Sequence, residues 1–497
     1  MMQKFLLTTI LILSTTANAH SVSEQATEKY FATIKNNPKQ RDIFLKTMPK
    51  GGDLHNHLGG ASLAENMIRY AKNDHLCINK QTLSVQEQVA CCPTYRLKNL
   101  IHTPRLYNAT IDAWSMRNFY AGKESGHDHF FATFDKYAPI LTKHRHEMTA
   151  EVVKNACEQN ALYLELMITP DNNASGLLGK QVGWNPNLRL LRKKLLNHGL
   201  STIVTHMSKQ LDGDDKISVC PDFKLRYLYQ VLREQPPAQV FAQLLAGFEL
   251  ASRNTRVLGI NIVQPEDGKI AMRDYTLHMH MIAFLHNLYP KVPISLHAGE
   301  LNANLVPVSG LRFHIRQAVE IAHANRIGHG VDIQQETHSV ALLKEMARKH
   351  ILVEINLSSN EAILGIKGKS HPILLYRRYN VPVALSTDDP GVLRTNLTEQ
   401  YKKAILSYDF SYFTIKNLVR NSISYSFLPG KSLWKDNQYH QMIPACQTPS
   451  RWPSPSGLTR GLIAGSIQCQ YFLKANEKAQ LQWTLENEFS SFEKQFQ

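Results

Sequence analysis

The stretch Gly52-Asp53-Leu54-His55-Asn56-His57-Leu58-Gly59-Gly60 carries two histidines that are separated by one residue. Side chains of a β-strand alternate between its two faces, so two imidazoles at this spacing project to the same side and can grip one cation. Imidazole nitrogens suit zinc and its divalent neighbours, and a catalytic zinc site needs few protein ligands. Such a pair also occurs as ordinary polar residues of a half-buried strand, so other segments must decide between the two interpretations.

Three later segments end apolar runs in polar side chains of the kind that a metal site uses. They are 292–300 with His297 and Glu300, 326–330 with His329, and 381–391 with Asp388 and Asp389. Taken singly, the second segment also fits a glycine turn, and the third fits an Asp-Asp-Pro-Gly turn. Taken together with the histidine pair, the segments predict one mononuclear metal site.

Eight segments have the apolar character of buried parallel strands. They are 53–57, 161–168, 201–206, 257–263, 292–297, 325–329, 351–357 and 381–387. Helix-length stretches such as 311–324 and 336–350 separate most of them, which is the alternation of βα units. We therefore predict an α/β fold, a (β/α)8 TIM-type barrel. The active site of that fold lies at the C-terminal ends of the strands, where the histidines and the aspartate pair fall.

These motifs, in this order, resemble those of the adenosine deaminase family within the metal-dependent amidohydrolases. The resemblance rests on Leu54-His55-Asn56-His57-Leu58-x-Gly60, Ser295-Leu296-His297-Ala298-Gly299-Glu300, Gly328-His329-Gly330 and Ser386-Thr387-Asp388-Asp389-Pro390, and it covers roughly residues 45–430. The segment 48–55, the long chain and the export-type start are most similar to the secreted growth-factor-type adenosine deaminases and their bacterial relatives.

The resemblance implies that each chain binds one Zn²⁺ through His55, His57, His297 and Asp388. Zinc lowers the pKa of a bound water, and the hydroxide so formed can attack C6 of a purine ring. The implied reaction is the hydrolytic deamination of adenosine, or deoxyadenosine, to inosine and ammonia.

The resemblance also implies roles for three further side chains. His329 would orient the hydroxide with Asp388 and take its proton, Glu300 would donate a proton to N1, and Asp389 would hydrogen-bond at N7. A carboxyl that donates a proton near neutral pH needs a raised pKa, which a desolvated pocket provides.

Two positions depart from the family pattern. Gly59 stands where many relatives have an aspartate that faces the ribose, and Gln264 stands where relatives have a glycine near N3 of the purine. The alternatives are another 6-aminopurine substrate (adenine, an N6-substituted adenosine or AMP), a different amidohydrolase reaction, or a non-catalytic adenosine-binding protein. No phosphate-binding signature for AMP accompanies the motifs. We interpret Glu165 and His206, which end up near the expected barrel core or mouth, as structural.

The chain is long enough, at 497 residues with 43% hydrophobic residues, to bury a barrel core with accessory helices in one large domain. The segment 58–160 exceeds a single crossover helix, which predicts an insertion with helices near 106–119 and 130–137. These helices either cap the barrel mouth or simply pack against it. We expect the following division: signal peptide 1–19, helical segment 20–47, deaminase barrel 48–430, and C-terminal helical extension 431–497.

The N-terminus predicts export. A short positive start is followed by the apolar run 5–13 and by the small-residue site Ala17-Asn18-Ala19, so we expect cleavage after Ala19 and a periplasmic or secreted protein. No later segment has the roughly 18 uninterrupted apolar residues of a membrane span. The net charge of +15 comes from scattered basic residues, which argues against nucleic acid as a partner. The expected partner is a small purine nucleoside.

Seven cysteines in an exported chain permit disulfides. We expect Cys77 to pair with Cys91 or Cys92, and Cys446 with Cys469. The odd number leaves at least one thiol free or bonded to another chain. Two helix-like segments within 457–497 either cover the base of the barrel or form a homodimer contact.

Overall fold

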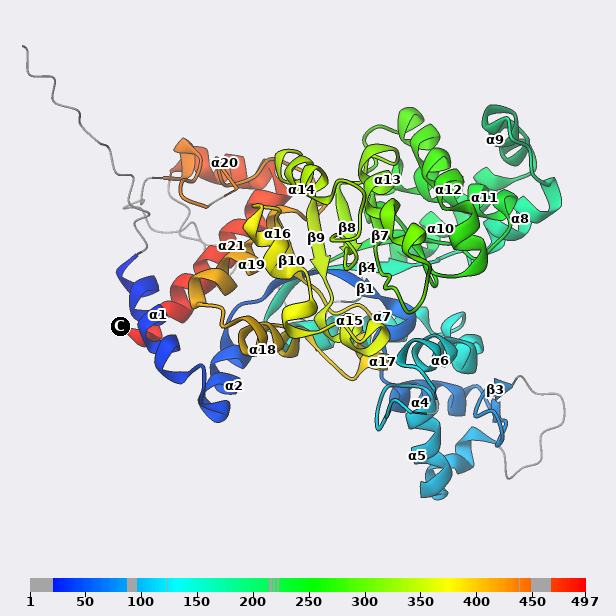
Figure 1. Cartoon of the computed structure of the whole chain (residues 1–497), viewed down its shortest axis with the longest axis horizontal. Helices are drawn as coiled ribbons and strands as arrows, with labels where there is room; N and C mark the ends of the chain where they lie inside the picture. Colours follow the sequence, from blue (N-terminus) through cyan, green and yellow to red (C-terminus); the bar gives the residue numbers. More distant parts are fainter. Residues whose placement is uncertain are drawn as a thin grey trace, which may run out of the picture.

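Eight parallel strands form the barrel at the centre of the molecule (Figure 1). The computed structural model describes residues 21–86, 96–122, 124–213, 217, 220, 223–437, 439–447 and 466–497. The barrel strands are β1 (Gly51–His57), β4 (Ala161–Ile168), β5 (Lys224–Leu232), β6 (Val257–Val263), β7 (Ser295–Ala298), β8 (Arg326–His329), β9 (Leu352–Ile355) and β10 (Val383–Leu385).

The strands pair in two half-sheets, β1-β4-β5-β6 and β7-β8-β9-β10. One parallel bridge between Ile260 and Ile294 joins β6 to the segment that enters β7, and a second between Asn56 and Asp388 joins β1 to the segment that leaves β10. These two bridges close the circle, so the (β/α)8 barrel expected from the sequence is confirmed.

The prediction of the third strand, at residues 201–206, is wrong. Residues 201–206 belong to the helix α10 (Leu200–Asp212), and the third barrel strand is β5. Val204 and Thr205 are β-branched and favour a strand locally. However, Val204 and Met207 are buried on one face of α10, and this packing outweighs the local preference. His206 is therefore an exposed helix residue, where it hydrogen-bonds Gln210, and not a residue of the barrel mouth.

Helices surround the barrel and bury its outer face (Figure 1). The expected helices 311–324 and 336–350 are present in shorter form, as α13 (His314–Glu320) and α14 (Ser339–Arg348). The surrounding helices are α7 (Arg145–Glu158), α8 (Ala174–Val182), α9 (Leu188–Asn197), α10, α11 (Pro237–Ala251), α12 (Lys269–Leu288), η4 (Val308–Arg312), α13 (His314–Glu320), α14 (Ser339–Arg348), α15 (Leu357–Leu364), η5 (Gly368–Ser370), α16 (Ile373–Arg378), α17 (Pro390–Leu393), α18 (Leu397–Tyr408) and α19 (Tyr412–Ser424).

The helical insertion expected after the first strand is present. It contains α3 (Leu58–Ala61), α4 (Ala64–Asn73), the hairpin of β2 (Cys77–Ile78) and β3 (Val85–Gln86), η2 (Leu97–His102), α5 (Pro104–Ala113) and α6 (Gly126–Leu141). His127 of α6 hydrogen-bonds Asp267, which follows β6, at 3.0 Å, and Gly126 lies against the backbone of Ala362 in α15. The insertion therefore packs on the side of the barrel where the strands end.

The two ends of the described chain pack together on one flank (Figure 1). The helices there are α1 (Val22–Ile34), α2 (Pro38–Thr47), η6 (Pro444–Cys446), α20 (Ile467–Ala475), α21 (Glu477–Glu493) and η7 (Lys494–Phe496). Tyr30 of α1 stacks on Phe496 with ring centroids 4.7 Å apart, and Phe44 of α2 contacts Phe492 at 5.0 Å. The C-terminal extension thus packs against the N-terminal helices, and α21 also contacts the barrel helix α19, where Arg420 donates to Glu486.

Two disulfides are seen in the described residues. The expected Cys446–Cys469 bond is confirmed, and Cys157–Cys220 is a bond that we did not predict. Cys77 is disulfide-bonded, but Cys91 and Cys92, its expected partners, lie outside the described residues, as does the expected signal peptide. Among the helices that the structure describes, none combines the length and the apolar character needed to cross a bilayer.

Candidate metal and catalytic site

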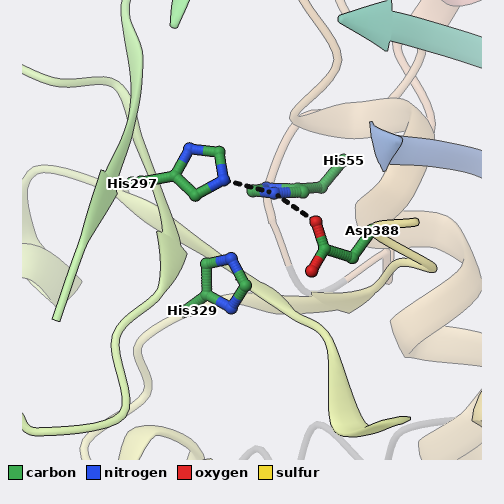
Figure 2. A group of neighbouring side chains, drawn as sticks. All are labelled: His55, His297, His329 and Asp388. Atoms are coloured by element: carbon green, nitrogen blue, oxygen red, sulfur yellow. Dashed lines mark hydrogen bonds and ion pairs between the residues drawn. The ribbon is translucent and has the colours of Figure 1, made fainter. Parts of the chain in front are cut away.

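Four side chains, from β1, β7 and the segment after β10, converge at the ends of the strands. The Nε2 atom of His55 lies 3.0 Å from that of His297 and 3.2 Å from that of His57, and the Nε2 atoms of His57 and His297 are 3.2 Å apart. The Oδ1 atom of Asp388 lies 3.4 Å from His55 Nε2 and 3.3 Å from His57 Nε2. Figure 2 shows His55 and His297, from two strands, and Asp388, from the segment after β10, pointing toward one another.

The other ring nitrogen of each histidine faces an acceptor oxygen. His55 Nδ1 lies 2.7 Å from Glu354 Oε2. His57 Nδ1 and His297 Nδ1 lie 2.9 Å from Gln230 Oε1 and 2.7 Å from Asn261 Oδ1. Each Nδ1 therefore carries the hydrogen, and a neutral ring then presents the lone pair of its Nε2 to the centre.

Three lone pairs that face one another within 3.2 Å repel unless a cation lies among them. In a tetrahedral site with metal–nitrogen distances of about 2.0–2.1 Å, neighbouring ligand atoms lie about 3.3 Å apart, which agrees with these spacings. The donor set, three imidazoles and one carboxylate, is one that zinc and related divalent ions accept. The side chains therefore fit a metal ion.

A chain of buried charges supports His55 from inside the barrel. Glu354 also accepts hydrogen bonds from Ser295 Oγ at 2.8 Å and from Arg326 Nε at 2.6 Å. Arg326 in turn donates to Glu165 at 2.5 Å. Burial lowers the pKa of His55, but its bonds to Asp388 and Glu354 raise it to about 10, so without a metal ion this ring favours a proton. A bound cation would take the place of that proton at Nε2. Glu165 is thus a structural residue of the core, as we interpreted it.

His329 lies beside this cluster and contributes a nitrogen within 4.8 Å of ligand atoms from His55, His297 and Asp388 (Figure 2). We do not count it as a ligand, because its ring nitrogens face the amides of Asn360 at 2.9 Å and of Asn356 at 3.5 Å. Burial lowers the pKa of His329 to about 3, so its ring is neutral.

The backbone at two of these positions adopts a conformation that residues other than glycine seldom take. His329 has φ +68° and Asp388 has φ +65°, both in the left-handed region. Strained residues of this kind cluster at functional sites, where the surrounding structure holds them in place.

Glu300 is buried directly after the turn that follows β7, with Oε1 3.5 Å from His329 Nδ1. Burial and the negative charges of Asp388 and Glu266 raise its pKa well above the ordinary value. The raised pKa favours the protonated form of Glu300, which is the form that can donate a proton.

Asp389 is buried beside Gly60, and its Oδ1 has no hydrogen-bond partner within the part of the chain that the structure describes. Burial and the charge of Asp388 raise its pKa well above the ordinary value. A neutral carboxyl with one free oxygen can bind a ring nitrogen as a hydrogen-bond donor.

The structure shows the surroundings of Gly59 and Gln264, the two positions that depart from the family pattern. A Cβ on Gly59 would meet only Leu141 Cδ1, at 3.6 Å, so a side chain fits there. Gln264 has φ +81°, a conformation that glycine adopts without strain, and its side-chain oxygen accepts a hydrogen bond from Glu234 N at 2.9 Å.

All seven site residues expected from the sequence lie at this mouth, while the side chains that orient them were missed. The missed residues are Gln230, Asn261, Glu266, Glu354 and Asn360. The one available signal was a charge inside an apolar strand, as at Glu354 in 352–355.

The chain is similar to several known deaminases. A curated adenosine deaminase from Clostridium kluyveri is 24% identical over 388 residues, which span 77% of this chain and 90% of that protein. An adenine deaminase from Rhizobium leguminosarum is 25% identical over 309 residues, which span 60% of this chain and 82% of that protein. The solved structure of an Arabidopsis N6-mAMP deaminase shares the fold, with a TM-score of 0.52, 21% identity, and coverage of 78% of this chain and 95% of that chain.

The family model described as adenosine deaminase matches residues 102–435, more than half of the chain. That match begins after His55 and His57, which the barrel brings to the same centre as His297 and Asp388. The chain therefore belongs to the adenosine deaminase family of hydrolases.

Proposed function

We propose that this protein is a zinc-dependent deaminase that converts adenosine, or deoxyadenosine, to inosine and ammonia. The observation that carries the proposal is the position of two buried carboxyls, those of Glu300 and Asp389, beside one cluster of side chains that could ligate a metal; burial raises the pKa of both carboxyls and so favours their neutral form. A purine ring offers acceptor nitrogens at N1 and N7, on either side of C6. Neutral carboxyls suit such acceptors, whereas ionised carboxylates would repel their lone pairs.

His55, His57, His297 and Asp388 would hold one Zn²⁺, which lowers the pKa of a water molecule toward neutrality when it is bound. Glu300 donates its proton to N1, which makes C6 more electrophilic. His329, neutral at physiological pH, accepts the proton that the attacking water releases. Asp389 donates to N7 and holds the ring in register. The burial of all these groups strengthens their hydrogen bonds with the substrate.

The choice among 6-aminopurines depends on contacts beyond the ring. Adenine, N6-substituted adenosine and AMP are the alternatives, and the names of the similar proteins include adenine and N6-mAMP deaminases. Because Gly59 stands in place of the aspartate that faces the ribose in many relatives, no carboxylate is available for that contact at this position. We expect Gly59→Asp, which has room for its side chain, to lower KM for adenosine and leave KM for adenine unchanged.

The test is the ultraviolet absorbance change of adenosine, AMP, adenine and N6-methyladenosine with the purified protein, with and without a chelator. We expect conversion of adenosine to inosine that the chelator abolishes and added zinc restores. Absence of turnover with every one of these purines, in protein that contains zinc, would contradict the proposal and favour an adenosine-binding protein.

Two variants separate the assigned roles. Glu300→Gln should keep its metal and lose turnover, since it can no longer donate a proton to N1. His297→Ala should lose metal and turnover together. An undiminished rate in Glu300→Gln would remove Glu300 from its role as the acid.

We further propose that the protein acts outside the cytoplasm, periplasmic or secreted. The disulfides Cys157–Cys220 and Cys446–Cys469 support an oxidising compartment. Cell fractionation with sequencing of the mature N-terminus tests this, and full-length protein in the cytosol would contradict it.

A further inference from the structure

Glu266 binds the backbone that carries Glu300. It follows β6 and is buried. Its Oε1 accepts a hydrogen bond from Gly299 N at 3.0 Å, and its Oε2 accepts one from Glu300 N at 2.8 Å. One carboxylate thus binds two successive N–H groups of the same turn, and its charge strengthens both bonds.

The turn depends on such an acceptor. Strand β7 ends at Ala298, and Gly299 leaves it with φ +76°. A Cβ at Gly299 would lie 2.4 Å from Asp332 Oδ1 and 2.7 Å from Ile315 Cδ1, so only glycine fits. The two N–H groups after the strand are buried and need acceptors, which Glu266 supplies.

His314, the first residue of α13, holds Glu266 in turn. Its Nδ1 lies 2.5 Å from Glu266 Oε1. The His314 ring stacks on Tyr275 with centroids 3.7 Å apart, and Tyr275 Oη donates to the His314 carbonyl at 2.8 Å. Burial raises the pKa of Glu266, but the bond from His314 and the nearby charges of His314 and Arg233 bring it below the ordinary value, so Glu266 is ionised.

We propose that Glu266, oriented by His314, is the positioning residue of the proton donor: it fixes the Gly299–Glu300 turn and thereby keeps the Glu300 carboxyl beside His329. Glu266 acts through the backbone and not by contact with the substrate. This inference rests on the proposed function, in which Glu300 is the acid.

A matched control is available in the same region. Glu336 is also buried, and it accepts a hydrogen bond from Arg316 N at 3.1 Å, not from the turn. Glu336→Gln therefore changes a buried carboxyl nearby without touching the Gly299–Glu300 backbone.

The first measurement is amide hydrogen exchange in metal-loaded wild type, Glu266→Gln and Glu336→Gln, followed on peptides that cover 297–302. Glutamine has nearly the same size, but its amide group cannot accept a hydrogen bond in place of the second oxygen. We expect exchange at Gly299 and Glu300 to be at least about tenfold faster in Glu266→Gln, with unchanged metal content and with Glu336→Gln like wild type. Unchanged exchange in Glu266→Gln would overturn the proposal.

A second variant covers the case in which Glu266→Gln does not fold. His314→Phe keeps a ring against Tyr275 and removes the hydrogen bond to Glu266. It should accelerate exchange in the same peptides by a smaller factor, and exchange at the wild-type rate would count against the proposal.

The second measurement is a double-mutant cycle with the best substrate. We expect kcat to fall about 100-fold in Glu266→Gln with KM within about threefold of wild type, since loss of alignment affects the reacting step. The double variant Glu266→Gln/Glu300→Gln should be no slower than Glu300→Gln alone, because Glu266 acts through Glu300. Additive losses, or an effect confined to KM, would overturn the proposal. If wild type converts no 6-aminopurine, the proposed function fails, while the exchange data still decide whether Glu266 holds the turn.

Discussion

Gly60 packs directly against Asp389: a Cβ at position 60 would lie 1.9 Å from Asp389 Oδ1 and 2.5 Å from its Cγ. The carboxyl that we assign to N7 thus occupies space that only a glycine leaves open. Gly60→Ala should displace Asp389 and lower kcat/KM by about 100-fold, as expected for a misplaced contact group, while metal content stays the same.

The adjacent glycine is the control for this substitution. Gly59→Ala adds the same methyl group where only Leu141 lies within reach, at 3.6 Å, and should have nearly the wild-type rate. Equal rates in both variants would show that Asp389 does not position the substrate.

Gly328 leaves room for the imidazole ring of His55. A Cβ at Gly328 would lie 2.6 Å from His55 Cε1 and 2.9 Å from His55 Nδ1. Gly328→Ala should therefore move this ligand and weaken metal binding by at least about tenfold, a loss similar to that of disturbed metal-site neighbours. Elemental analysis after dialysis against a weak chelator measures the effect. Gly122→Ala, at a position where a Cβ meets nothing within 4 Å, should retain its metal.

Glu354 links the ligand His55 to the buried Arg326. Glu354→Gln removes the charge that both groups require, and Arg326 then keeps Glu165 as its carboxylate partner. We expect metal affinity to fall about 10- to 100-fold and the melting temperature of the metal-free protein to fall as well. Competition with a coloured zinc chelator gives the affinity, and an unchanged value would separate Glu354 from the metal site.

Lys50 predicts a specific dependence of stability on pH. It is buried, its Nζ donates to the Met48 carbonyl at 2.9 Å, and burial lowers its pKa from 10.5 to about 7. The Lys50 amine binds its proton more tightly in the unfolded chain than in the folded protein. The buried ammonium therefore lowers the free energy of unfolding by its full amount below about pH 7, and this destabilisation disappears as pH rises toward 10.5. Lys50→Met removes the buried ammonium and with it this destabilisation.

The measurement is the difference in melting temperature between wild type and Lys50→Met at several pH values. Wild type should gain stability relative to the variant between pH 7 and pH 9. A constant difference would show that Lys50 is not deprotonated in the folded protein.

The sequence predicts those parts of this molecule that depend on local pattern. An apolar strand that ends in a ligand, as at His297 and Asp388, is visible in a single sequence, and the order of such strands predicts the barrel. The segment 201–206 misleads because its β-branched residues favour a strand, whereas the burial of one face in α10 depends on distant neighbours. In β5, Lys224 and Arg226 interrupt the apolar pattern, so the true strand is less evident.

A local sequence pattern does not predict which residues far apart in the sequence contact each other. His57 of β1 meets Gln230 of β5 across the intervening strand β4, and His297 of β7 meets Asn261 of β6. Both contacts form only when the barrel strands are assembled. The Cys157–Cys220 bond likewise connects segments that share no motif. Such pairs depend on the three-dimensional closure of the barrel.

The closure of the barrel between Asn56 and Asp388 has a consequence for biosynthesis. His55 and His57 leave the ribosome early, whereas Asp388 emerges only after nearly the whole barrel has been translated. A nascent chain accordingly offers two imidazoles and no complete site, and a metal ion bound at that stage is held by half of its final ligands. The complete set of candidate ligands therefore exists only after the first and last strands of the barrel have paired.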